Sequence, residues 1–128
     1  MMKTYTKPVV TIDNGMAEGV YAASGAVQGT LNVTYYGVMD KWGTNGGKGM
    51  AQADWSGIDG TITLNITFND TVDDVDTNDA SVQTSWSGKT ATLTFASTVA
   101  NPLTIGIHIN HGTSIDDLKM TGFTYSVN

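Results

Sequence analysis

The sequence contains no cysteine, no arginine and a single glutamate, Glu18, and it has no apolar run near the roughly 20 residues that a membrane span requires. Without cysteine no disulfide can form, and this leaves the redox compartment open. A chain of 128 residues is long enough to bury a core without such cross-links. Glu and Arg are common on helix surfaces, so their near absence disfavours a helical fold. Nucleic acid is not expected as a partner, because the net charge is −6 and the six lysines are scattered.

The stretch Gly60–Asn69 has the clearest pattern in the chain. Apolar and polar residues alternate along it, which is the two-residue period of a strand with one buried face and one wet face. We expect it to be the central strand of a sheet. Its inward residues would be Ile62, Leu64, Ile66 and Phe68.

Several other short segments alternate in the same way, and none has the pattern of a helix that could cover an apolar sheet. Strands are expected at 3–12, 30–37, 50–55, 80–86, 89–96, 103–110 and 118–127. Residues 38–49 read as a glycine-rich loop, 70–79 as an acidic connection, and Ser87-Gly88 as a two-residue hairpin turn. Seven to nine short strands predict a two-sheet antiparallel β-sandwich, immunoglobulin-like or jelly-roll-like. We expect one domain over 1–128, with 1–25 as an N-terminal edge strand, arm or leader-like segment.

The acidic connection is the densest polar feature. Asp74, Asp76 and Asn78 alternate in the way that lets a calcium loop present oxygens to one ion. An EF-hand would then need Gly and Glu where Asp79 and Ser85 stand, so that motif fails. Two interpretations of the acidic connection remain, a looser calcium site and a solvated acidic turn. We favour the turn, because runs of like charge are usually exposed. No other cofactor is expected.

The residues expected for catalysis are not assembled in a known pattern. His108 and His111 are three residues apart, which places them on opposite faces of a continuous strand, and no cysteine could complete a usual zinc set. Ser114 and Asp116 follow His111, but the sequence has no nucleophile elbow. The sequence therefore does not predict an enzyme.

Aromatic residues indicate a binding function. Trp42 lies among glycines, Trp55 precedes a turn, Trp86 abuts the expected hairpin, and Tyr36 is on the polar face of its strand. The flat CH face of a sugar stacks on an exposed indole, while Asn, Asp and Gln bind the hydroxyls. The alternative is an indole folded over the end of the core. We favour that alternative for Trp86 and leave both readings open for Trp42.

From Val33 to Ile109 the order of features resembles that of bacterial cellulose-binding modules with an immunoglobulin-like sandwich. The shared features are the Trp42-Gly43 loop, the TLNITF strand, Trp86 before a glycine, the TATLTF strand and an Ile-rich last pair. The chain departs from that family in lacking its cysteine pair and its Asn-Thr-Gly hairpin. The resemblance implies stacking roles for Trp42 and Trp86, and Trp55 is added on general grounds.

The resemblance leads to the expectation of a noncatalytic extracellular module that binds polysaccharide. The segment AEGVYAASG is also similar to N-terminal segments of small exported proteins of Gram-positive bacteria, which favours the cell surface although no standard signal peptide is visible. The alternative function is a structural cell-surface or filament subunit. Such a subunit would form homo-oligomers by strand-edge pairing, with Lys3–Ile12 as the connecting strand. The competing interpretation, which we favour, is that Lys3–Ile12 completes the sandwich of its own chain.

Overall fold

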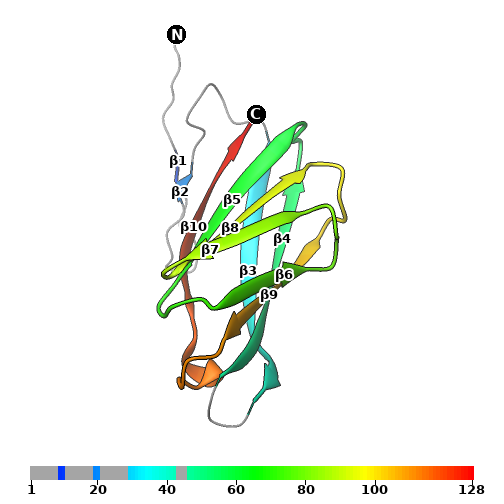
Figure 1. Cartoon of the computed structure of the whole chain (residues 1–128). Coiled ribbons are helices and arrows are strands. Elements are labelled where there is room, and N and C mark those ends of the chain that lie inside the picture. Colours follow the sequence, from blue (N-terminus) through cyan, green and yellow to red (C-terminus); the bar gives the residue numbers. More distant parts are fainter. Residues whose placement is uncertain (1–8, 11–18, 21–28, 43–45) are drawn as a thin grey trace.

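The computed structural model describes residues 9–10, 19–20, 29–42 and 46–128 and shows two antiparallel four-stranded sheets that pack face to face (Figure 1). This confirms the predicted all-β sandwich. One sheet has the strand order β10-β5-β8-β7 and is called the β5 sheet; the other has the order β3-β4-β9-β6 and is called the β9 sheet. A separate pair joins β1 (Val9–Val10) to β2 (Gly19–Val20).

The strands differ greatly in length. The β5 sheet contains β5 (Thr61–Phe68), β7 (Gln83–Ser87), β8 (Thr90–Ala96) and β10 (Met120–Val127). The β9 sheet contains β3 (Thr30–Lys41), β4 (Gly47–Ser56), β6 (Asp74–Thr77) and β9 (Leu103–Ile109). A 3-10 turn, η1 (Ile115–Asp117), lies at the end of the sandwich opposite the C-terminus (Figure 1).

The core lies between the sheets, as the alternation predicts. Ile62, Leu64 and Ile66 of β5 are fully buried, and the intervening threonines and Asn65 face away from the core. The alternating apolar residues of β9, which include Leu103 and Ile105, are also fully buried. Removing these side chains from water is the main driving force that joins the two sheets.

Tyr35 packs the inner side of β3 against the opposite sheet. Its ring meets Phe68 edge to face, with centroids 5.7 Å apart and planes at 74°. Its hydroxyl lies over the backbone of Gly49, where a Cβ would collide with it. Among the described residues this hydroxyl is buried without a hydrogen-bond partner. Glycine is therefore required at position 49 by the ring above it.

Three sequence predictions need correction. The expected loop at 38–49 is largely strand, because β3 runs to Lys41 and absorbs extra residues in irregularities after Tyr35 and Val38. The acidic connection contains β6, which was missed because it has one buried apolar residue, Val75. The tight turn is Gly88-Lys89, one residue later than expected, with Gly88 at φ +58°.

The N-terminal predictions fall mostly outside the described residues. Of the expected strand Lys3–Ile12, the structure describes Val9 and Val10, which pair with Gly19 and Val20. β2 in turn contacts β10. The roles proposed for residues 1–25 therefore stay predictions.

Candidate functional site

Trp42 is placed directly after β3, beside the outer face of the β9 sheet. Its backbone N–H donates to the Gly46 carbonyl at 3.0 Å, which closes the end of the β3–β4 hairpin. Its indole Nε1–H donates to Asp40 Oδ2, also at 3.0 Å. The side chain is 38% exposed. One hydrogen bond thus holds the backbone of Trp42 and the other orients its indole, which remains accessible to solvent.

The indole lies beside the imidazole of His108, with ring centroids 5.6 Å apart. His108 belongs to β9, and its Nε2 is hydrogen-bonded to Asp76 Oδ2 of β6 at 2.9 Å. Lys48 of β4 reaches the same oxygen, with its Nζ at 3.3 Å. We call Asp40, Trp42, Lys48, Asp76 and His108 the Trp42 cluster.

The sheet register explains how the cluster forms. Lys48 of β4 lies opposite His108 of β9, while Asp76 of β6 lies opposite Gly106. Gly106 and His108 alternate with the buried isoleucines of β9, so both face the outer side of the sheet. Their cross-strand partners Asp76 and Lys48 lie on the same outer face. A Cβ on Gly106 would collide with the side chains of Lys48 and Asp76. The glycine thus allows these two side chains to meet above the middle strand.

The Trp42 cluster combines an apolar ring with closely spaced donors and acceptors. The Lys48 ammonium has three donors, of which the contact with Asp76 uses one. Asp40 and Asp76 contribute two carboxylates, so acidic groups exceed the single ammonium. Such a surface can stack a flat apolar ligand face and bind hydroxyl groups at its rim.

Trp55 does not belong to this surface, contrary to the prediction of an exposed indole. It points inward from β4, is 8% exposed and packs against Phe95 with ring centroids 5.1 Å apart. Its Nε1–H donates to the Ser97 carbonyl at 3.0 Å, and the Trp55 carbonyl accepts from Asn101 Nδ2 at 2.8 Å. The parity of β4 places Trp55 with Ala51 and Ala53, so it is a core residue.

Trp86 and Tyr36 are both accessible, but they occupy different places. Trp86 is on the edge strand β7, opposite the buried Ala91, and is 41% exposed. Tyr36 is 58% exposed at the first irregularity of β3, in the β9 sheet. The three tryptophans therefore do not form one continuous platform, since Trp55 is buried and Trp86 belongs to the other sheet.

The oxygens expected to bind calcium are engaged with protein groups. Asp74 Oδ1 accepts from the N–H of Val75 at 2.8 Å, and Asn78 Oδ1 accepts from the N–H of Thr104 at 3.1 Å. Asp76 binds His108 and Lys48, as described above. Within the described ranges, no group of three or more His, Cys, Asp or Glu side chains is arranged to hold a metal ion.

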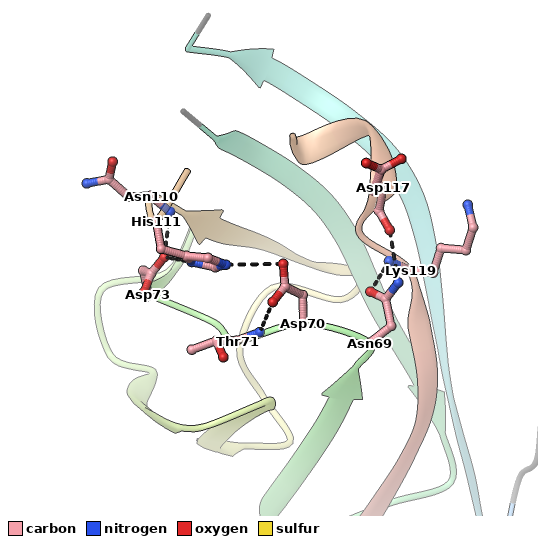
Figure 2. Close-up of polar contacts among 8 residues, drawn as sticks. All are labelled: Asn69, Asp70, Thr71, Asp73, Asn110, His111, Asp117 and Lys119. Carbon is pink, nitrogen blue, oxygen red and sulfur yellow. Dashed lines mark hydrogen bonds and ion pairs between the residues drawn. The ribbon is translucent and has the colours of Figure 1, made fainter. Parts of the chain in front are cut away.

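A second polar cluster joins the two loops at one end of the β9 sheet (Figure 2). The imidazole of His111 lies between two carboxylates of the β5–β6 loop, residues 69–73. Its Nε2 is 3.1 Å from Asp70 Oδ2, and its Nδ1 is hydrogen-bonded to Asp73 Oδ2. The same Asp73 oxygen accepts the backbone N–H of Asn110. We call Asp70, Asp73 and His111 the His111 clasp.

The positive charge of His111 and the negative charges of Asp70 and Asp73 stabilise one another. Hydrogen bonds to Asp73 and Asp70 raise the pKa of His111 above its ordinary value. Partial burial acts to raise the pKa of Asp70, but hydrogen bonds from Thr71 and His111 outweigh it and lower that pKa. In the same way, hydrogen bonds from His111 and Asn110 outweigh burial and lower the pKa of Asp73.

Asn69 makes a separate connection between the same parts of the chain. Its Nδ2 donates to the Asp117 carbonyl at 2.9 Å, and its Oδ1 accepts from the N–H of Lys119 at 2.8 Å (Figure 2). Its backbone N–H also donates to the Lys119 carbonyl at 3.0 Å. This connection contains no titrating group.

Sequence reasoning found Trp42 but not its neighbours. Asp76 was considered as a metal ligand, and His108 was considered with His111, whereas the structure pairs Asp76 with His108. His108 alternates with Ile107 and Ile109, which is the pattern of a residue on the wet face of a strand. Its partner could not be identified, because β6 was read as a loop.

The comparisons with known proteins add no assignment: the chain matches no protein-family model, no curated protein and no solved structure. The resemblance to cellulose-binding modules therefore stays a prediction. In the part of the chain that the structure describes, no helix has the length and apolar character needed to cross a bilayer.

Proposed function

We propose that this protein is a noncatalytic carbohydrate-binding module that binds polysaccharide outside the cell through the Trp42 cluster. The observation that carries the proposal is the accessible indole of Trp42, fixed by Asp40 and flanked by His108. An indole that is already oriented loses little conformational freedom when a ligand stacks on it. This favours binding over a role as a mobile surface residue.

The polar part of the cluster suits the hydroxyls of a sugar ring. Lys48 can donate to a hydroxyl while it remains bonded to Asp76, and the carboxylates can accept from hydroxyls. Asp40 and Asp76 outnumber Lys48, and the whole chain carries a net charge of −6. Polyanionic glycans would therefore be repelled, so we expect a neutral polysaccharide.

The proposal is tested by affinity measurements on a panel of neutral and acidic plant and cell-wall polysaccharides. The matched variants are Trp42→Ala and Trp86→Ala, because both indoles are similarly exposed but belong to different sheets. We expect Trp42→Ala to weaken binding by about 30-fold, as for an interface hot spot. Trp86→Ala should leave the affinity unchanged. Absence of binding to every glycan at millimolar concentration would refute the proposal.

A second candidate is a structural subunit that assembles through strand edges. β3 is an edge strand of the β9 sheet with 12 residues, and it carries the exposed Tyr36, Val38 and Met39. A long edge strand with apolar side chains is a template for pairing with another chain. Sedimentation of the wild type and Val38→Lys over a wide concentration range tests this candidate. Self-association that the lysine abolishes supports it, and a monomer at all concentrations contradicts it.

A further inference from the structure

We propose that the His111 clasp is a pH-sensitive latch, which holds the segment 70–73 against residues 110–111 in mildly acidic solution and releases it in alkaline solution. This proposal is independent of glycan binding. It rests on the position of one imidazole between two carboxylates that come from a different loop.

The geometry requires a protonated imidazole. An ionised carboxylate only accepts hydrogen bonds, so both nitrogens of His111 must donate if both bonds are to form. A neutral imidazole has one N–H and one lone pair. Loss of the proton would therefore turn one nitrogen into an acceptor that faces Asp70 or Asp73, and that contact would become repulsive.

Among the described residues, no other positively charged group takes the place of the imidazolium between Asp70 and Asp73. The charged groups that face His111 are Asp70 and Asp73, and Thr113 adds a neutral hydrogen bond to Asp70. The nearby pair Lys41–Asp116 is engaged at 2.6 Å. Without the imidazolium, Asp70 and Asp73 would face each other as like charges, and the segment between them would separate from Asn110.

The opening is expected to remain local. Asn69 keeps its contacts with the Asp117 carbonyl and the Lys119 N–H, because these are uncharged backbone groups. The backbone N–H of Asp73 also donates to the His108 carbonyl at 2.9 Å, which ties the start of β6 to β9. The latch therefore controls the segment between Asp70 and Asp73 and the residues 110–111, while the sandwich stays folded.

The pH window follows from the directions of the shifts. The pKa of His111 is raised above its ordinary value of 6.5. The stability that His111 contributes to the clasp is therefore complete below 6.5 and is lost as the pH rises through the pKa of the folded state. The pKa values of Asp70 and Asp73 are lowered below the ordinary value of 3.8. The stability that they contribute is therefore complete above 3.8 and is lost as the pH falls through their folded-state pKa values. The latch is therefore closed at pH values between the folded-state pKa values of the two aspartates and that of His111.

NMR on the full chain tests the latch. The two histidines give two ring signals, which the variant His108→Gln assigns. We expect the His111 signal to titrate above 6.5, and Asp70→Asn to lower its midpoint. The amide protection factor of Asn110, corrected for intrinsic exchange, should fall at least about tenfold between pH of about 5.5 and about 9. The amide of Lys119, held by Asn69, should not change.

Thermal melting gives a second readout that does not depend on assignment. The difference in Tm between wild type and His111→Gln should be about 4 °C in mildly acidic buffer and should vanish in alkaline buffer. If His111→Gln fails to fold, Asp70→Asn serves the same comparison. A His111 midpoint at or below 6.5, or Asn110 protection that does not depend on pH, would overturn the proposal.

Discussion

The indole of Trp42 lies against the imidazole of His108, with ring centroids 5.6 Å apart, although 66 positions of the chain separate the two residues. The contact forms because Trp42 directly follows β3, His108 belongs to β9, and β4 runs between these strands. It joins the exposed indole to the ion pair of Lys48 and Asp76. The binding surface thus depends on the register of the whole β9 sheet.

Gly106→Ala is expected to disable this surface while the fold is kept. The new Cβ would displace the flexible side chains of Lys48 and Asp76, and no buried group would have to move. We expect the free energy of unfolding to change by no more than about 0.5 kcal/mol and glycan affinity to fall. The control is Gly122→Ala in β10, where a Cβ meets nothing within 4 Å. Equal affinity of the two variants would show that Lys48 and Asp76 take no part in binding.

Tyr35 and Gly49 are expected to be energetically coupled. Tyr35→Phe removes a buried hydroxyl that has no partner among the described residues, so it should raise the free energy of unfolding by about 1 kcal/mol. Gly49→Ala should lower it by about 1–3 kcal/mol, because the methyl group meets that hydroxyl. In denaturant unfolding the double variant should be more stable than the sum of the two single changes predicts, because the added methyl group no longer meets a hydroxyl. Additive effects would contradict the packing described, and Tyr36→Phe, on an exposed ring, is the control.

Trp55→Phe tests whether Trp55 is a core residue or a ligand-binding residue. The change removes the donor to the Ser97 carbonyl and leaves a smaller ring against Phe95, so it should cost about 1–3 kcal/mol of stability. Glycan affinity should be unchanged, because the ring is buried. Chemical denaturation and binding assays on the same sample measure both quantities. Reduced affinity with unchanged stability would place Trp55 in the binding surface after all.

Calcium is expected to have no effect on stability. Asp76 is bound to Lys48 and His108, and Asn78 accepts from Thr104, so the oxygens of β6 are not directed at one ion. The Tm of the wild type should be the same in chelator and in millimolar calcium, and so should that of Asp74→Asn. A calcium-dependent rise in the wild type that Asp74→Asn removes would reveal a site, since a ligand specific for the folded state stabilises it.

The parts of the fold with strong alternation could be predicted from the sequence. In β5 and β9 every second residue is a large apolar side chain, so the period alone identifies the strand and its buried face. β6 has only Val75 to bury, and the end of β3 is interrupted by irregularities, so neither shows a clean period. These segments are strands because their neighbours supply backbone partners, which is a tertiary effect.

The candidate site could be predicted only as single residues. Exposure of Trp42 and burial of Trp55 depend on which face of each strand is covered, and both residues look alike in the sequence, next to glycine-containing turns. The pairing of His111 with Asp70 and Asp73 joins loops about 40 positions apart, which no local pattern encodes. Long-range register decides these contacts.

The most direct test of the proposed function is an NMR titration that follows the three indole N–H signals while a neutral polysaccharide is added. Each tryptophan gives one such signal, and Trp→Phe variants assign them. The proposed binding surface predicts that the Trp42 signal shifts in a saturable manner, while the signals of the buried Trp55 and of Trp86 on the other sheet stay in place. A panel of glycans that leaves the Trp42 signal unmoved, or that moves only Trp86, would contradict it.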